Sequence, residues 1–168
     1  AATHALYVQI RDGLVGPGRA AGIVAPTVLP PTNLPEQTTS FIGRQTELAA
    51  IVGCLSQRSH RAITITGAAG IGKTRLALAA AAEVKRNYPQ GIWYVPLAGV
   101  FADGADAPLA DHLAQQIIVD EIATALKLTF PFQADPARQL VDSLRARRIL
   151  LLLDGLEPLP PAVVPFLQ

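Results

Sequence analysis

Apolar residues recur along this chain at the spacings of strands and helices, and they predict a strand and a helix near its middle. Residues 62–66 are apolar and rich in β-branched side chains, which is typical of a buried strand. Residues 73–86 contain neither Gly nor Pro, and Leu76, Ala80 and Val84 recur at every fourth position. That spacing predicts a helix with one apolar face.

The same patterns predict further elements on both sides of this pair. The spacing at residues 44–57 predicts a helix with an apolar stripe. The continuous apolar run at 149–153 predicts a strand buried on both faces. Pro96 indicates that pairing of its strand stops there or that the strand lies at a sheet edge. The other predicted elements are a strand at 92–97, a helix at 109–128 that is continuous or broken near Val119, and a helix starting at Asp135-Pro136, an acidic N-cap followed by Pro. Because strands alternate with helices, the predicted fold class is α/β with a parallel sheet.

The N-terminal residues have a different composition. Residues 3–11 predict a short helix, with Leu6, Val8 and Ile10 among polar neighbours. Residues 20–35 consist mainly of Ala, Gly, Val, Thr and Pro, which predicts an extended linker. We therefore expect a short leading segment at 1–13, a Pro/Gly-rich linker at 14–34 and a globular domain from 35 to 168.

Composition and charge exclude several classes of protein. The chain has 168 residues, of which 50% are hydrophobic, and a formal net charge of +1. That is enough for one domain, without the charge excess that draws a protein to DNA or to a membrane surface. No apolar run of about 18 residues occurs, so no membrane span is predicted. The single cysteine, Cys54, excludes an intrachain disulfide and is consistent with a cytoplasmic location.

The loop between the first predicted strand and helix carries the motif G-x-x-x-x-G-K-T at residues 67–74, here called the glycine-rich loop. Its glycines let backbone N–H groups turn toward phosphate oxygens, and the following helix adds its unpaired N-terminal donors. Lys73 supplies a cation for the β- and γ-phosphates, and Thr74 supplies a hydroxyl ligand for Mg²⁺. The motif and its context predict a site for ATP or ADP with Mg²⁺.

A second acidic position follows the predicted strand at 149–153. Asp154 stands at the C-terminal end of that strand, where ligands of open α/β sheets bind, and we expect it to hold Mg²⁺ opposite Thr74. This is the form of a Walker B motif. Glu157 lies three residues further on, and two interpretations stay open: a base that polarises an attacking water, or a solvated turn residue.

With these motifs together, the chain resembles the nucleotide-binding domain of bacterial STAND-type signalling ATPases, which are related to the NB-ARC and AAA+ groups. The nearest resemblance is to large transcriptional regulators of the SARP-like and LuxR-like kinds, and it covers roughly residues 33–160. The stretches that carry it are Asn33-Leu34-Pro35 through Phe41-Ile42-Gly43-Arg44 with Glu47, the glycine-rich loop through Leu76-Ala77, Gly91 to Val95, and Leu150 to Asp154 with Glu157.

The resemblance implies a switch in which ADP holds a closed form, while ATP and a signal open it and favour oligomers. Hydrolysis in such proteins is slow. It also implies that residues 1–13 are the tail of a preceding helical domain, and that Ile42, Gly43 and Arg44 pack beside the adenine and ribose. The expected catalytic residues are Lys73, Asp154 and Glu157; the expected nucleotide contacts are Ile42, Gly43, Arg44, Gly67, Ala68, Ala69, Gly70, Ile71, Gly72, Lys73, Thr74 and Arg75; the expected metal ligands are Thr74 and Asp154.

The chain departs from this family in two ways. Gly155 occupies a position where many such ATPases carry a second acid or an Asn. In the family, a strand that follows Asp154 in sequence inserts between the strand before the glycine-rich loop and the strand that ends at Asp154; here it would come after Gln168, as would the lid regions. The resemblance therefore implies an incomplete three-layer P-loop NTPase fold whose central sheet position is empty or wrongly filled. Such a chain binds nucleotide without efficient turnover and needs the remainder of its own ATPase module.

Two other functions stay open from the sequence. One is a non-catalytic interaction fragment that keeps the motifs. The other is a small P-loop kinase, which would need an acceptor site and a lid with arginines that the sequence does not show. In every case we expect DNA contacts to lie in domains outside these residues.

Overall fold

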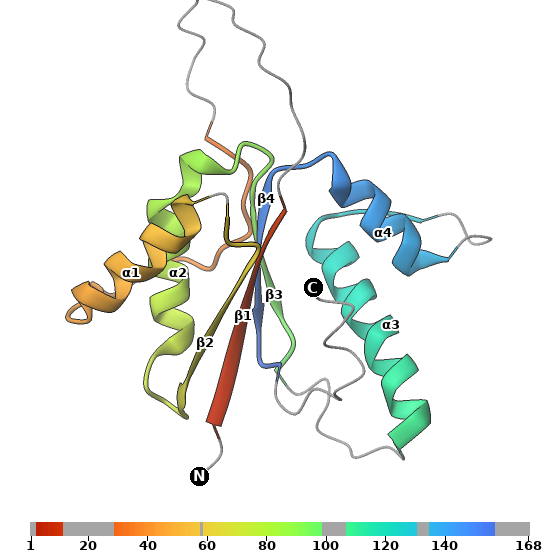
Figure 1. Ribbon diagram of the computed structural model, residues 1–168, viewed down its shortest axis with the longest axis horizontal. Coiled ribbons are helices and arrows are strands. Elements are labelled where there is room, and N and C mark those ends of the chain that lie inside the picture. Colours follow the sequence, from red (N-terminus) through yellow and green to blue (C-terminus); the bar gives the residue numbers. More distant parts are fainter. Residues whose placement is uncertain (1–2, 12–28, 58, 99–106, 131–134, 157–168) are drawn as a thin grey trace, which may run out of the picture.

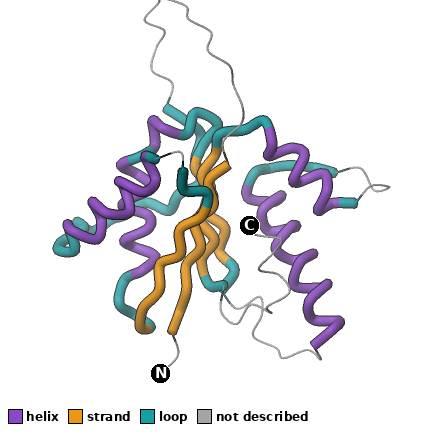
Figure 2. The backbone as a smooth tube through the Cα atoms, in the orientation of Figure 1, coloured by secondary structure: helices purple, strands orange, loops and turns teal. Residues whose placement is uncertain are grey.

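The computed structural model describes residues 3–11, 29–57, 59–98, 107–130 and 135–156. A four-stranded sheet lies between two helical layers (Figure 1). The backbone trace in Figure 2 shows the same arrangement, with helices flanking the strands on both sides. Helices α1 (Gln45–Ser56) and α2 (Lys73–Glu83) cover one face, and α3 (Ala107–Ala125) and α4 (Pro136–Arg145) cover the other. The strands are β1 (Thr3–Arg11), β2 (Ala62–Ala68), β3 (Ile92–Pro96) and β4 (Ile149–Asp154), and a short 3₁₀ turn, η1 (Lys85–Asn87), follows α2.

Strand β4 is buried on both faces, as its uninterrupted apolar run predicts. Leu150 and Leu152 belong to the apolar cluster under α1 and α2. Ile149, Leu151 and Leu153 belong to the cluster under α3 and α4. Because successive side chains of a strand point to opposite faces, β4 needs apolar residues at every position to fill both clusters.

The predicted apolar face of α2 is confirmed. Leu76, Ala80 and Val84 are all buried, and they pack in one cluster with Leu48 and Leu55 of α1. Burial of these two stripes holds α2 against the sheet and so places the glycine-rich loop, which lies directly before it.

The second helical layer confirms most of its predicted elements. Helix α4 begins with Pro136, and the Asp135 carboxylate accepts a hydrogen bond from the Ala137 backbone N–H at 3.0 Å, as an acidic N-cap should. Helix α3 runs through Val119 without a break. Leu113 of α3 is 48% exposed. The buried stripe is formed by Ala114, Ile118 and Ile122, which lie one position further round the helix.

The sheet has the order β2-β1-β4-β3, and its arrangement corrects two sequence predictions. Residues 3–11 form a strand rather than a helix, and β1 runs antiparallel to both β2 and β4, while β3 is parallel to β4. The sheet is therefore mixed rather than wholly parallel. Leu6, Val8 and Ile10 recur every second residue, which is the period of a strand and would scatter them around a helix. The division into a leading segment, a linker and a domain stays a prediction.

Strand β1 lies between β2 and β4, at the central sheet position that the family resemblance predicted to be empty or wrongly filled. Its backbone pairs from Thr3↔Ala68 to Gln9↔Ala62 on one side and from Leu6↔Asp154 to Arg11↔Ile149 on the other. The facing edges of β2 and β4 are therefore both satisfied through β1.

The end of the predicted linker pairs with the outer edge of β3. The Pro31 carbonyl accepts a hydrogen bond from the Ile92 N–H at 3.1 Å, and Thr32 forms a parallel bridge with Ile92. Gly91 allows this approach: its φ is +111°, and a Cβ there would lie 2.6 Å from the Pro31 oxygen. β3 thus lies at the edge among the named strands, as Pro96 indicates, with residues 31–33 running beside it.

Candidate phosphate-binding site

The glycine-rich loop leaves the end of β2 and enters α2 at Lys73, in the order that the sequence predicts. Gly70 and Gly72 have φ angles of +74° and +88°, in the left-handed region that favours glycine. The Ile71 N–H donates to the Ala68 carbonyl at 3.4 Å and closes the turn. The loop backbone is therefore shaped by its glycines, and it ends at the N-terminus of an 11-residue helix.

The Lys73 side chain folds back over this loop. Its Nζ donates hydrogen bonds to the carbonyl oxygens of Gly67 and Ala68, at 3.1 and 3.0 Å. The ammonium group is thus held at the loop, where it adds a positive charge to the positive end of the α2 dipole. An anion at this helix terminus would be attracted both by the Lys73 ammonium and by the helix dipole.

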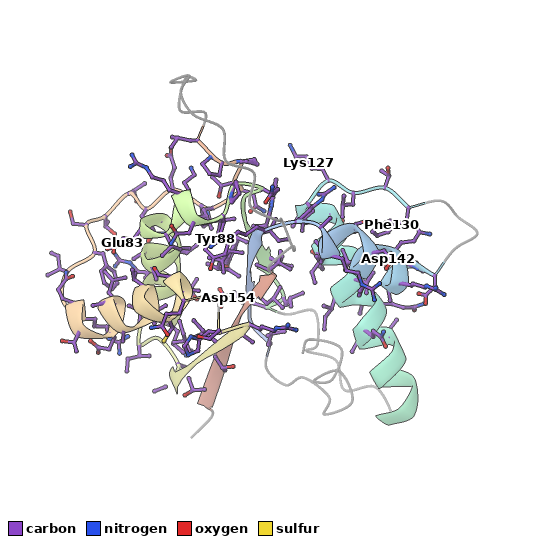
Figure 3. All side chains as sticks on the ribbon, turned by 45° about the horizontal axis from the view of Figure 1, so that its top comes forward. Glu83, Tyr88, Lys127, Phe130, Asp142 and Asp154 are labelled. Atoms are coloured by element: carbon purple, nitrogen blue, oxygen red, sulfur yellow. The ribbon has the colours of Figure 1, made fainter. Side chains whose placement is uncertain are left out.

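The Thr74 and Asp154 side chains meet, as the sequence predicts. Thr74 Oγ1 donates to Asp154 at 3.0 Å from Oδ1 and 2.9 Å from Oδ2. Asp154 lies at the end of β4, in the centre of the view in Figure 3. The carboxylate is on the α1/α2 face because it follows Leu150 and Leu152 at two-residue intervals.

Tyr94 is a member of this site that sequence reasoning missed. Its phenolic hydroxyl donates to Asp154 Oδ2 at 2.8 Å. Burial, together with the hydrogen bond to Asp154 and its charge, raises the pKa of Tyr94 to about 12. The phenol therefore stays a neutral donor at any ordinary pH. The sequence predicts a strand at 92–97, but only the β3–β4 register brings Tyr94 to Asp154.

These oxygen atoms fit Mg²⁺ as a ligand set. Mg²⁺ prefers hard oxygen ligands and is usually held by one or two protein side chains together with water and phosphate oxygens. Thr74 and Asp154 supply a hydroxyl and a carboxylate at one point beside Lys73. Among the described residues, no group of three or more His, Cys, Asp or Glu side chains is placed to bind a metal by itself. The site therefore suits a metal that arrives with a phosphate ligand.

The segment that precedes α1 lies against the glycine-rich loop. Arg44, at φ +56°, donates from Nη1 to the Ile71 carbonyl at 3.0 Å, and its Nε lies 3.7 Å from Glu47 Oε1. Ile42 is 89% exposed and Ile71 is 47% exposed. The structure thus brings Ile42, Gly43 and Arg44 next to the loop, with apolar side chains open to solvent on both segments.

Arg75 turns away from the loop toward this same segment. Its Nη2 donates to Thr39 Oγ1 at 2.9 Å and to the carbonyl oxygens of Thr39 and Ser40 at 3.3 and 3.1 Å. Its guanidinium ties residues 39–40 to the first turn of α2, and the expected contact of Arg75 with nucleotide stays a prediction.

Comparison with known families decides the class of domain. Residues 40–168 match the model of the AAA ATPase domain family. The chain belongs to this family. Its mixed α/β fold with parallel strands is accordingly that of a partial P-loop NTPase. Strand β1 precedes the matched residues, so the central strand of this AAA domain comes from outside the family match.

Curated relatives of this AAA domain come from Mycobacterium and Streptomyces. The chain is 31% identical to the uncharacterized protein Rv0894 of Mycobacterium tuberculosis over 121 residues, which cover 72% of this chain and 27% of that protein. It is 33% identical to the regulatory protein AfsR of Streptomyces griseus over 132 residues, which cover 76% of this chain and 13% of AfsR. The chain thus spans about a quarter or less of the relatives it matches. No solved structure matches it.

The residue after Asp154 cannot carry a side chain in this AAA domain. Gly155 has φ +82°, and a Cβ there would lie 2.5 Å from the Ala98 backbone nitrogen. The second acid that many related ATPases carry at this position is therefore excluded by the close approach of the chain after β3. Glu157, the other predicted catalytic residue, lies outside the described residues.

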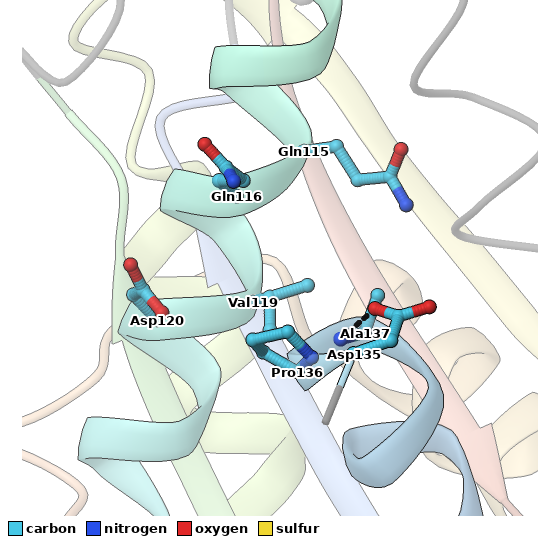
Figure 4. Close-up of a pocket in the computed structure, with 7 residues that line it drawn as sticks. All are labelled: Gln115, Gln116, Val119, Asp120, Asp135, Pro136 and Ala137. Atoms are coloured by element: carbon cyan, nitrogen blue, oxygen red, sulfur yellow. Dashed lines mark hydrogen bonds between the residues drawn. The ribbon is translucent and has the colours of Figure 1, made fainter. Parts of the chain in front are cut away.

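A cavity in the AAA domain lies on the opposite side of the sheet from this site. Its volume is about 400 Å³, and it opens between α3 and α4 (Figure 4). Asp135, one of its acidic residues, already caps α4. The lining residues are Gln115, Gln116, Val119, Asp120, Asp135, Pro136 and Ala137. It contains none of the residues predicted for nucleotide binding. Within the described ranges, no helix is long and apolar enough to cross a membrane.

Proposed function

We propose that this AAA domain is a Mg²⁺-dependent ATP/ADP-binding switch of a regulatory protein. The observation that carries the proposal is the contact of Thr74 with Asp154 beside Lys73. It joins a phosphate-binding loop to a metal-binding carboxylate across 80 residues of sequence. Similarity to a protein named as regulatory, AfsR, supports the regulatory role.

In this proposal each part of the site has a separate task. The N–H groups of the glycine-rich loop and of the α2 N-terminus bind the phosphates. Lys73 exchanges the carbonyls of Gly67 and Ala68 for phosphate oxygens. Thr74 and Asp154 would hold Mg²⁺, which would supply positive charge against the phosphates. Ile42, Gly43 and Arg44 border the base and ribose.

The switch acts through a difference between nucleotide states. The γ-phosphate shifts the protein toward one conformation only through contacts that differ between the two conformations. We place the domain with STAND-type ATPases, in the cytoplasm, with slow hydrolysis in the whole protein. Its partners are then the remainder of its ATPase module and, on activation, other copies of the protein, while DNA contacts belong to other domains.

Titration with a fluorescent ADP analogue in the presence of Mg²⁺ tests the proposal. Wild-type protein should bind, and Lys73→Ala should bind at least about tenfold more weakly, because a charge-assisted contact to phosphate is lost. Lys127→Ala is the matched control, since Lys127 is an exposed lysine that follows α3 on the other side of the sheet.

Three outcomes would overturn the proposal. Absence of binding by the wild-type protein, or equal binding by Lys73→Ala, would favour a non-catalytic interaction fragment. Transfer of phosphate from ATP to a small metabolite would favour a kinase.

A further inference from the structure

Two tyrosine hydroxyls of this chain donate to different kinds of acceptor, a backbone carbonyl and a carboxylate. Tyr88 is fully buried, and its hydroxyl donates to the Leu55 carbonyl at 2.8 Å, which ties the end of η1 to α1. Tyr94 is only partly buried in the same apolar cluster, and its hydroxyl ends on the carboxylate of Asp154 at 2.8 Å. The first bond is between two structural elements; the second reaches the acidic group of the candidate site.

Strand register explains how Tyr94 reaches Asp154. In the parallel β3–β4 pair, Tyr94 lies opposite Leu152, and Asp154 lies two residues beyond Leu152 on the same face. Diagonal neighbours of this kind are within reach of a long aromatic side chain. The ring therefore reaches from β3, at the edge, to the end of β4.

Tyr94 itself is held from the other side of β3. The Asn33 side chain donates from Nδ2 to the Tyr94 carbonyl at 2.8 Å, and its Oδ1 accepts from the Tyr94 N–H at 2.6 Å. An amide group that satisfies both backbone groups of one residue fixes that residue at the sheet edge. A continuous path of hydrogen bonds thus runs from Asn33 through Tyr94 and Asp154 to Thr74.

We propose that Tyr94 is a positioning residue for Asp154, which sets the carboxylate in the orientation that binds Mg²⁺ together with Thr74. The inference rests on the proposed nucleotide-binding function. Asp154 Oδ2 accepts from both Tyr94 and Thr74, whereas Oδ1 accepts from Thr74. Rotation of the carboxylate would break the bond to the phenol, so its lone pairs stay fixed. Partners of this kind typically change metal affinity when they are removed.

Substitution Tyr94→Phe, read out as the Mg²⁺ concentration that gives half of the maximal gain in ADP affinity, tests the proposal. We expect this midpoint to rise about tenfold, in line with losses of groups that orient metal ligands. Affinity for ADP in EDTA should stay within about twofold of wild type, since the loop and Lys73 are untouched. If Tyr94 served packing alone, Tyr94→Phe would change the Mg²⁺ midpoint and the ADP affinity in EDTA together, or would change neither.

Tyr88→Phe is the matched control, because it removes a phenolic hydroxyl from the same apolar cluster without touching Asp154. Its Mg²⁺ midpoint should equal that of wild type. In an Asp154→Asn background, Tyr94→Phe should add little, because Tyr94 acts through the carboxylate.

Asn33→Ala gives an independent test if Tyr94→Phe folds poorly. It leaves the phenol in place and loosens only its backbone, so the midpoint should rise in the same direction by a smaller factor. An unchanged midpoint in both variants, with wild-type protein still showing Mg²⁺-dependent binding, overturns the role of Tyr94 and leaves the proposed function standing. Loss of Mg²⁺ dependence in the wild-type protein itself overturns both.

Discussion

Thr74 Oγ1 lies 2.9 Å from Asp154 Oδ2, although 80 residues separate the two positions in the chain. The contact joins the first turn of α2 to the last residue of β4. Packing of α2 against the sheet through Leu76 and Ala80 brings the two side chains together. The fold itself therefore places the hydroxyl against the carboxylate.

Replacement of the Thr74 hydroxyl should weaken binding that depends on Mg²⁺. Thr74→Val keeps the branched shape and removes the oxygen ligand, so we expect about tenfold weaker binding of ADP with Mg²⁺. Thr74→Ser keeps the hydroxyl and should stay within about threefold of wild type. Isothermal titration with and without Mg²⁺ measures both; equal affinity of Thr74→Val and wild type would contradict a metal ligand at this position.

Interruption of β1 should destabilise the whole sheet, because β1 joins β2 to β4. Val8 pairs with Ile63 on one side and Leu152 on the other. Proline at this position removes a backbone N–H from a central strand, and we expect the free energy of unfolding to fall by about 2–4 kcal/mol. Urea denaturation measures it.

The matched control for this prediction is Val8→Thr, which keeps both the β-branch and the N–H and should have a much smaller effect. A Val8→Pro protein as stable as Val8→Thr would show that residues 3–11 do not pair as the central strand.

Alanine at two glycines should have opposite effects on stability. Gly155→Ala forces a Cβ into the Ala98 backbone at a positive φ, so we expect a loss of about 2 kcal/mol or more. Gly53 lies inside α1 with no atom within 4 Å of an added Cβ, so Gly53→Ala should stabilise by about 0.5–1 kcal/mol. Thermal unfolding of the two variants, measured side by side, checks the sign of each change.

Local patterns were sufficient for much of the fold. The apolar run of β4, the stripe of α2 and the Asp135-Pro136 helix start each depend on neighbours in sequence, and each is confirmed. The helix predicted for residues 3–11 is wrong, because Leu6, Val8 and Ile10 recur with the period of a strand. A nine-residue stretch becomes a strand here because β2 and β4 offer it two edges.

For the candidate site, sequence placed Lys73 and Thr74 in the loop and Asp154 at a strand end, and the structure brings them together. The sequence did not identify Tyr94 or Asn33 as members of the site. Nor did it show that a side chain at position 155 would clash with the chain after β3. Those three depend on the β3–β4 register, on the edge pairing of residues 31–33 and on the approach of Ala98, all contacts between segments far apart in the chain.

Glycine conformations, apolar periods and motif spacing are properties of neighbouring residues, so the glycine-rich loop and the helices around it could be predicted from the sequence. Two features appear only in the folded chain: β1 enters the sheet between β2 and β4, and Tyr94 joins Thr74 in holding Asp154. The physical reason is that strand order and register are set by which edges and apolar faces remain to be covered once the whole chain packs. No local pattern carries that information.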